Sequence, residues 1–364
     1  MTSSTARHDP PRRLVVQQSF PEPRPTTNPY IVMLRHALEA VPELEVRTWS
    51  WRRALLGRYD VLHVHWPEYQ VQASTPLRTA ARQVLFAALL AKLAVRRVPI
   101  VRTQHNVQPP SGLSRRQKVL LGWFERRTAL RIALNDDTAA VVGANTVVVP
   151  HGHYRDWFAA YPRAELRPDT FGYFGLVRRY KNVEGLMTAF SALEGDVRLR
   201  IAGKPSSQEL TTSLETRAAA DPRIELSLAF LTDAELVQVA TGCALVVLPY
   251  THMHNSGSVL ASLSLGTPVL VPATPTNAAL AEEVGPGWVL QFEGDLAPAD
   301  LRRALEQAQT VDRSTGPDLS RRGWEGTGSA HLDAYRVALG QAPATGRPQD
   351  VRHARPQEQV SARA

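Results

Sequence analysis

A chain of 364 residues can form two hydrophobic cores of ordinary size, and 43% hydrophobic with 21% charged residues is typical of a globular protein. The single cysteine, Cys243, excludes a disulfide framework, and the apolar run 84–95, interrupted by Lys92, is too short to cross a bilayer. A net charge of +8 is compatible with a polyanionic partner, but only four of the 42 basic residues are lysine, a bias equally typical of a GC-rich genome.

Strands and helices alternate along the first half of the chain. Strands are predicted at 13–19, 44–51, 60–66, 99–104, 130–134 and 146–149, and helices at 29–40, 79–96, 115–127 and 136–142. This alternation is typical of a parallel, doubly wound sheet. We therefore expect a Rossmann-like domain over residues 12–153. The polar, proline-rich residues before it have no apolar signal core, so we expect a disordered leader and a cytoplasmic protein.

The second half repeats the scheme after a linker predicted at 154–168. Its strands are predicted at 170–175, 197–202, 224–229, 244–249, 268–271 and 288–292, and its helices at 183–193, 206–220, 232–241, 256–264, 276–284 and 297–309. We expect a second domain over 169–322 and a last amphipathic helix over 323–340. The Gln-, Pro-, Arg- and Ala-rich segment 341–364 indicates a disordered tail.

Ligands of open parallel sheets bind beyond the carboxyl ends of the strands. In the first half these ends carry the loop 21–28 and six polar or aromatic candidates: His65, Trp66, Glu68, His105, Asn106 and His151. Glu68 or His105 could act as a general base on a hydroxyl group. The alternatives are a surface glutamate and a structural histidine. We expect the other four to line the cleft or to contact a substrate bound there.

The most informative segment is 171–182, where an apolar strand runs into Gly175 and then into a basic loop before a helix. Backbone N–H groups, a helix N-terminus and cationic side chains at one point suit a diphosphate. A solvated basic loop is the alternative. The residues expected to bind such a nucleotide-linked diphosphate are Gly175, Arg178, Arg179, Lys181, Lys204, Tyr250, Asn255, Ser256, Gly257 and Ser258.

These motifs resemble a known family. Gly175 with Lys181, the Lys204 strand end and the run 258–268 look like the C-terminal half of GT-B glycosyltransferases, nearest to family 4 and to bacterial exopolysaccharide enzymes. Residues 60–68, 103–106 and 149–152 extend the resemblance into the first half. It implies an α/β protein with two Rossmann-like domains facing a cleft, the first binding an acceptor and the second a nucleotide-sugar donor, either GDP- or UDP-linked. It also implies that the last helix crosses back to the first domain.

Carried over by position, Lys181 matches the lysine that binds the donor diphosphate, and His105 matches a histidine near the donor sugar. Two departures stand out. Leu176 occupies the place of a usual arginine, whose charge Arg178 or Arg179 could supply, and the two positions of the family's paired glutamates fall near Met253 and on Ala261. Without that carboxylate pair, the chain favours an inverting over a retaining mechanism, with Glu68 or His105 as base.

The resemblance also implies a glycan or lipid-linked acceptor and a role in exopolysaccharide or cell-envelope synthesis. For this role we extend the helix to 115–131; it carries basic residues beside Leu120, Leu121, Trp123 and Phe124, which suits an anionic membrane surface. The alternative is a helix whose apolar residues face the core. We expect a peripheral protein on the inner face of the plasma membrane. The basic residues of that segment are Arg115, Arg116, Lys118, Arg126, Arg127 and Arg131.

We expect neither a cofactor nor a metal, since His151, His153, His252 and His254 have no carboxylate or cysteine beside them. Two other functions fit part of the sequence. A nucleic-acid or anionic-surface binding protein would use the same basic residues, but no recognition helix, zinc module or aromatic sheet motif is present, so we expect no nucleic-acid partner. A sugar-nucleotide epimerase of similar fold would act on the donor without an acceptor.

Overall fold

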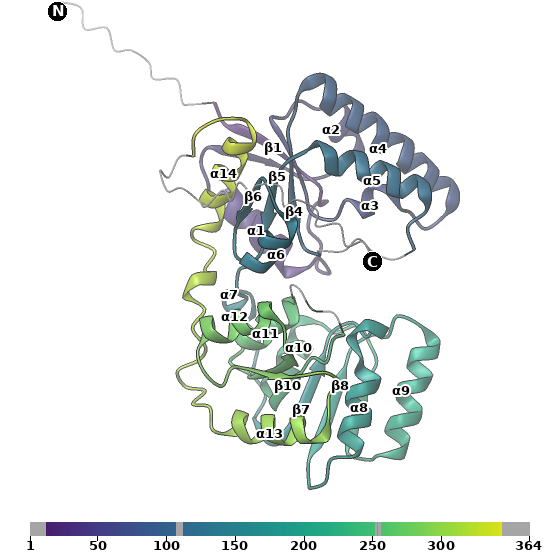
Figure 1. Cartoon of the computed structure of the whole chain (residues 1–364), viewed down its shortest axis with the longest axis vertical. Helices are drawn as coiled ribbons and strands as arrows, with labels where there is room; N and C mark the ends of the chain where they lie inside the picture. The colour runs from purple at the N-terminus through teal and green to yellow at the C-terminus, as the bar shows by residue number, and fades with distance from the viewer. Residues whose placement is uncertain (1–11, 107–111, 252, 254–255, 344–364) are drawn as a thin grey trace, which may run out of the picture. The chain divides into compact units, whose positions relative to one another are not determined.

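The computed structural model describes residues 12–106, 112–251, 253 and 256–343. They form two compact units: unit 1 runs up to His151 and resumes at Trp324, and unit 2 is Gly152–Gly323 (Figure 1). Each unit holds a six-stranded sheet whose strands are all parallel. The predicted α/β class with two doubly wound sheets is confirmed.

Unit 1 has the strand order β2-β1-β3-β4-β5-β6. Its elements are β1 (Leu14–Gln18), α1 (Pro29–Glu39), β2 (Leu44–Arg47), α2 (Trp51–Leu56), β3 (Val61–Val64), α3 (Glu68–Val71), α4 (Pro76–Arg96), β4 (Ile100–Gln104), α5 (Arg115–Arg127), β5 (Thr128–Ala133), α6 (Asp136–Val142), β6 (Thr146–Val148) and α14 (Thr327–Ala338).

The two faces of the unit 1 sheet differ in polarity because side chains alternate along a strand. Leu62 and Val64 of β3 pack into an apolar cluster with Phe86 of α4 and Phe124 of α5. His63, between them in sequence, is also fully buried but bonds to the last helix, α14. The helices α2–α5 therefore cover an apolar face, while α14 covers a face that carries buried polar groups.

Helix α14 packs closely on α1 within unit 1. A Cβ at Gly328 would lie 2.2 Å from the carbonyl oxygen of Ala37, so only glycine allows this approach. Farther along α14, the Tyr335 hydroxyl lies 2.8 Å from His63 Nδ1 and accepts a hydrogen bond from Gln18 Nε2 at 3.2 Å. Helix α14 thus completes the interior of the unit whose sheet is formed by β1–β6.

Unit 2 has the strand order β12-β11-β10-β7-β8-β9. Its elements are α7 (Arg155–Phe158), β7 (Arg167–Phe174), the short 3-10 helix η1 (Arg179–Lys181), α8 (Val183–Ser191), β8 (Arg198–Ala202), α9 (Gln208–Ala220), β9 (Ile224–Ser227), α10 (Asp233–Thr241), β10 (Cys243–Val247), α11 (Gly257–Ser264), β11 (Val269–Pro272), α12 (Pro275–Val284), β12 (Val289–Phe292), α13 (Pro298–Gln309) and η2 (Ser320–Arg322).

Several boundaries differ from the predicted ones. The strand predicted at 44–51 ends at Arg47, because the Ser50 hydroxyl caps α2 by accepting a hydrogen bond from Arg53 N at 3.1 Å. Unit 2 begins at Gly152, and the segment predicted as a linker contains α7 and the start of β7. Helix α5 ends at Arg127, and Arg131 lies on β5, so Arg131 does not belong to the basic helix.

Candidate active site

The basic loop after β7 in unit 2 is held against the loop after β8. Val177 N donates to the Lys204 carbonyl at 3.0 Å, and Ser206 N donates to the Val177 carbonyl at 2.9 Å. A Cβ at Gly203 would lie 1.8 Å from the Gly175 carbonyl oxygen, which makes glycine obligatory at 203. Gly175 itself has φ +108°, a conformation that turns the chain sharply at the strand end. The loop therefore has a fixed path toward η1 and α8.

Lys181 ends this loop and turns inward. Its side chain is largely buried, and its Nζ lies 4.8 Å from the centroid of the Tyr250 ring, a cation–π contact. Within the part of the chain that the structure describes, no carboxylate pairs with it. Burial lowers the pKa of Lys181 to about 8. A cation that is buried without a counter-charge is well placed to receive an anion.

The N-terminus of α11 meets Lys181 at the same strand edge. A Cβ at Gly175 would lie 3.7 Å from both Lys181 Nζ and Ser258 Oγ, so the loop and the helix start come together. Ser258 Oγ lies 3.4 Å from the Tyr250 hydroxyl, and Ser256 caps the helix by accepting from Val259 N at 3.4 Å. Ammonium, hydroxyl and helix N-terminus are the groups that bind phosphate in proteins, which makes this strand edge the candidate phosphate site of unit 2.

The remaining predicted donor residues are placed differently. Arg178, Arg179 and Lys204 have exposed side chains, and Arg179 forms an ion pair with Glu209 at 2.6 Å. Gly257 begins α11 and belongs to the site through its backbone. Asn255 lies outside the described residues, as do His252 and His254. In this structure Lys181 contributes the buried positive charge, and Arg178 adds charge at the rim.

Unit 1 contains a cavity of about 860 Å³ at the carboxyl edge of its sheet. Such a volume is typical of a small-molecule site. Among its described lining residues are five of the predicted ones: His65, Trp66, Glu68, His105 and Asn106. None of the lining residues that the structure describes comes from the loop 21–28. Most of the first-half candidates, which were selected because they follow strand ends, therefore lie around one cavity.

Glu68 opens the short helix α3 and lines this cavity while half-buried. Burial raises the pKa of its carboxyl group, and the nearby Arg102 opposes that rise. A carboxylate with a raised pKa is a stronger base than one in water. The position and the electrostatics of Glu68 therefore suit proton abstraction from a bound hydroxyl.

His105 is held by aromatic neighbours. The indole of Trp66 stacks on its ring, with centroids 4.1 Å apart and planes 18° apart, and the Tyr30 ring meets it edge-on at 5.3 Å. Tyr30 also contacts His151, whose ring centroid lies 4.5 Å away. Burial lowers the pKa of His105 well below its ordinary value. His105 is therefore a neutral imidazole at physiological pH.

Sequence reasoning missed the ion-pair cluster at the cavity wall. Arg102 and Arg131, from β4 and β5, both pair with Glu125 of α5, Arg131 at 3.3 Å. All three residues line the cavity together with Lys118. The signal that could have revealed it is Arg102 itself, a charged residue inside the otherwise buried strand 100–104.

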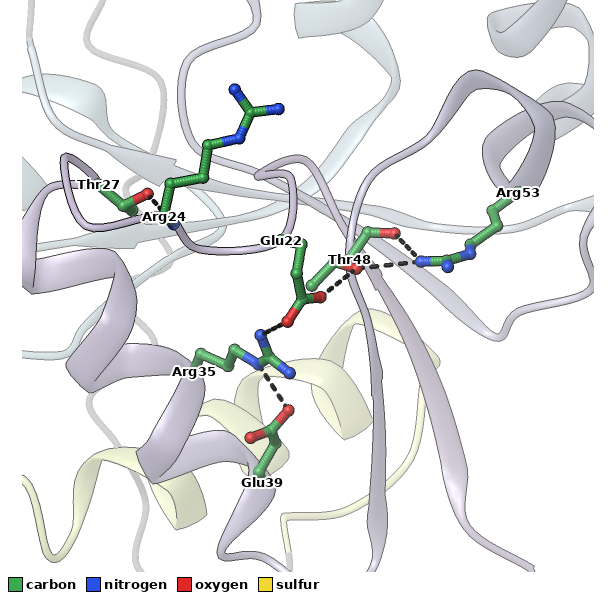
Figure 2. Close-up of polar contacts among 7 residues, drawn as sticks. All are labelled: Glu22, Arg24, Thr27, Arg35, Glu39, Thr48 and Arg53. Carbon is green, nitrogen blue, oxygen red and sulfur yellow. Dashed lines mark hydrogen bonds and ion pairs between the residues drawn. The ribbon is translucent and has the colours of Figure 1, made fainter.

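The loop 21–28 forms a surface network instead (Figure 2). Glu22 pairs with Arg35 of α1 and accepts a hydrogen bond from the Thr48 hydroxyl at 3.1 Å. Arg53 donates to the same hydroxyl at 3.0 Å. The pKa of Glu22 is lowered, first by its hydrogen bond with Arg35. This network fastens the proline-rich loop to α1 and to the end of β2.

Comparison with known proteins assigns this architecture. The profile of the family described as Glycosyl transferases group 1 matches residues 168–309. The GDP-mannose:glycolipid 4-beta-D-mannosyltransferase of Xanthomonas campestris pv. campestris is 42% identical over 329 residues, 90% of this chain and 93% of the relative. The chain belongs to this glycosyltransferase family. The alternatives of a polyanion-binding protein and of an epimerase are not favoured, because the relative is a sugar transferase over nearly its whole length.

Solved structures of similar fold agree with the GT-B architecture. Anabaena HepE in complex with UDP has a TM-score of 0.56 at 14% identity, covering 90% of this chain and 98% of the other. The catalytic domain of Arabidopsis thaliana starch synthase IV has a TM-score of 0.60 at 10% identity, covering 91% and 100%. At such identities the likeness establishes the fold alone. This glycosyltransferase therefore has the GT-B fold that the sequence resemblance implied.

Two further observations bear on the cofactor and membrane expectations. Among residues 12–106, 112–251, 253 and 256–343, no three His, Cys, Asp or Glu side chains are grouped so that they could hold a metal ion. None of the helices formed by these residues has the length and apolarity needed to span a bilayer.

Proposed function

We propose that this glycosyltransferase moves mannose from GDP-mannose to a glycolipid. The observation that carries the proposal is the 42% identity, over 90% of the chain, to an enzyme whose name states that donor and that acceptor class. Exopolysaccharide or cell-envelope glycan assembly is the setting that we infer for such a product. The pairing of a phosphate-type site in unit 2 with a large cavity in unit 1 supports the division into donor and acceptor halves.

In the donor half, the leaving GDP carries the negative charge that develops as the glycosidic bond breaks. Lys181, the Ser258 hydroxyl and the N-terminus of α11 would stabilise that charge without a metal ion. Arg178 at the rim would add long-range attraction. Tyr250 would hold Lys181 in place through its ring.

In the acceptor half, the cavity beside Glu68 would hold the sugar that receives mannose. Glu68 would take the proton from the attacking hydroxyl as the new bond forms. A β-linkage made from an α-linked nucleotide sugar requires inversion, which needs one such base and no covalent intermediate. The family's paired glutamates are replaced here by residues that are not acidic, near Met253 and at Ala261, and this agrees with inversion.

The donor assignment can be tested by thermal unfolding of the purified protein with GDP-mannose, UDP-glucose or GDP. Ligand at about 100 times its Kd adds roughly 2.7 kcal/mol of stability, so GDP-mannose and GDP should raise Tm, and UDP-glucose should not. Transfer of radiolabel from GDP-mannose into the organic extract of bacterial membranes should follow. Stabilisation by UDP-glucose alone would overturn the proposed donor.

The surface of α5 supports docking on an anionic membrane on the cytoplasmic side. Leu120 and Leu121 pack toward the core and Phe124 is fully buried, but the side chains of Val119 and Trp123 are 51% and 49% exposed. They share a helix face with exposed basic residues, which suits an interfacial helix. These basic residues are Arg115, Arg116, Lys118, Arg126 and Arg127.

Membrane docking predicts that R126E/R127E weakens sedimentation with vesicles containing anionic lipid. Each basic residue near such a surface contributes about 1 kcal/mol, so the loss should be at least tenfold. The matched control is R198E/R302E, which reverses two exposed arginines of unit 2. An equal loss of vesicle binding in both variants would mean that net charge alone determines binding. No loss in either variant would exclude α5 as the docking surface.

A further inference from the structure

A row of buried imidazoles lies behind His105. His63 lies on β3 and His65 directly follows its end; the two residues are two apart and point to the same face, with ring centroids 4.4 Å apart. His63 is bonded at both nitrogens, Nδ1 to the Tyr335 hydroxyl and Nε2 to Thr103 Oγ1, each at 2.8 Å. The position of His63 is thus fixed by α14 and β4.

His65 is bonded differently. Its Nδ1 lies 3.2 Å from Nε2 of His105, while its own Nε2 is buried and has no hydrogen-bond partner among the described residues. The rings of Phe20 and Tyr30 lie near it, with centroids 5.6 Å and 6.3 Å away. His65 is 1% exposed, so water does not replace the missing partner at its surface.

Only one proton can lie between His65 Nδ1 and His105 Nε2 while both rings are neutral. If it belonged to His105, then His65 would carry its proton on the buried Nε2, where the described residues offer no acceptor. Buried N–H groups without an acceptor are rarer than unpaired acceptors. The proton therefore belongs to His65 Nδ1, and the unpaired Nε2 of His65 is a bare lone pair.

We propose that His65 is a positioning residue that donates its Nδ1 proton in a hydrogen bond to His105 and so fixes His105 as the Nδ1–H tautomer. His105 then acts as a hydrogen-bond donor to a substrate oxygen in the unit 1 cavity. It cannot accept a proton at Nε2, because the bond to His65 occupies that nitrogen. Glu68 is therefore the remaining candidate for the general base. The identity of the substrate oxygen rests on the proposed sugar transfer. The tautomer of His105 does not depend on it.

Direct evidence would come from long-range ¹H–¹⁵N NMR of the full-length protein labelled with ¹⁵N-histidine. The assigned His105 should show a protonated Nδ1 and an unprotonated Nε2, and His65 the same pattern. A protonated Nε2 on His105 in the wild-type protein would overturn the proposal, whether or not any variant folds. Because this readout needs no substrate, it separates the proposal from the donor and acceptor assignments.

Kinetics supply the second readout. H65F keeps a ring but removes the donor, so kcat should fall about tenfold, the equivalent of one hydrogen bond, with the KM for donor little changed. H65N keeps an N–H group near the Nδ1 position and should recover most of that loss. Full activity in a folded H65F protein, or equal losses in H65N and H65F, would contradict a positioning role.

Discussion

Replacing Lys181 by methionine is expected to weaken binding of the nucleoside diphosphate about 10- to 100-fold, because a hydrogen bond to a charged group is worth about 1.5–3 kcal/mol. Methionine is also unbranched, so packing against Tyr250 changes little. The buried ammonium has no carboxylate partner among the described residues, so its removal should not lower the Tm of the free protein. Calorimetric titration with GDP measures the first effect and thermal unfolding the second.

The pH dependence of the same equilibrium gives an independent check. The pKa of Lys181 is about 8 in the free protein, lowered first by burial and further by Arg178, while Tyr180 opposes the shift. The protonated form binds the diphosphate, so affinity should fall as pH rises through about 8 and be steady below it. K181M should lose this dependence. R179A is the matched control, since Arg179 pairs with Glu209, and its affinity should stay close to that of the wild type. Unchanged GDP affinity in K181M would remove Lys181 from the donor site.

Glu68→Gln should lower kcat by about 10²- to 10⁴-fold, the usual contribution of a general base. The amide has the size of the carboxyl group, so the cavity keeps its shape, and GDP affinity should remain near normal. Burial raises the pKa of Glu68, so the wild-type rate should fall as the pH drops through a value above the ordinary 4.5 of a glutamate. Steady-state rates across acidic and neutral pH measure both effects.

A matched variant at the same cavity is E125Q. Glu125 is engaged by Arg102 and Arg131, so its loss should lower Tm. The acidic limb should persist but move to lower pH, because the charge of Glu125 helps to raise the pKa of Glu68. If E68Q retains full kcat, or keeps the same acidic limb, Glu68 is not the base.

The sequence predicted the sheets because buried parallel strands are nearly continuous apolar runs, and those of β10 and β11 are easily found. It also predicted the strand ends that carry Lys181 and Glu68, since the chain order of strands and helices determines which edge they share. Cap residues set the finer boundaries. Ser50 ends the extended segment after β2, a local signal that the apolar pattern of 44–51 obscured.

The sequence pattern alone could not predict which side chains contact one another. The pairing of Arg179 with Glu209 and the inward turn of Lys181 depend on how η1 meets α9 and the segment after β10, and no local sequence spacing predicts that. The bond between His65 and His105 joins residues 40 positions apart, and that between His63 and Tyr335 joins residues 272 apart. Such contacts follow from strand order and from the return of the last helix.

The return of α14 to unit 1 also affects the order in which the two units can fold during synthesis on the ribosome. Unit 2 is one continuous stretch, Gly152–Gly323, and all its strands have been made before α14 emerges. The sheet of unit 1 is synthesised first, yet Gln18 and His63 can form their hydrogen bonds with Tyr335 only after α14 has been translated. The later-made unit can therefore fold before the earlier one is complete, against the usual N-terminal-first sequence of domain folding. A stop codon just before α14 would spare unit 2 and leave unit 1 with an open polar interior.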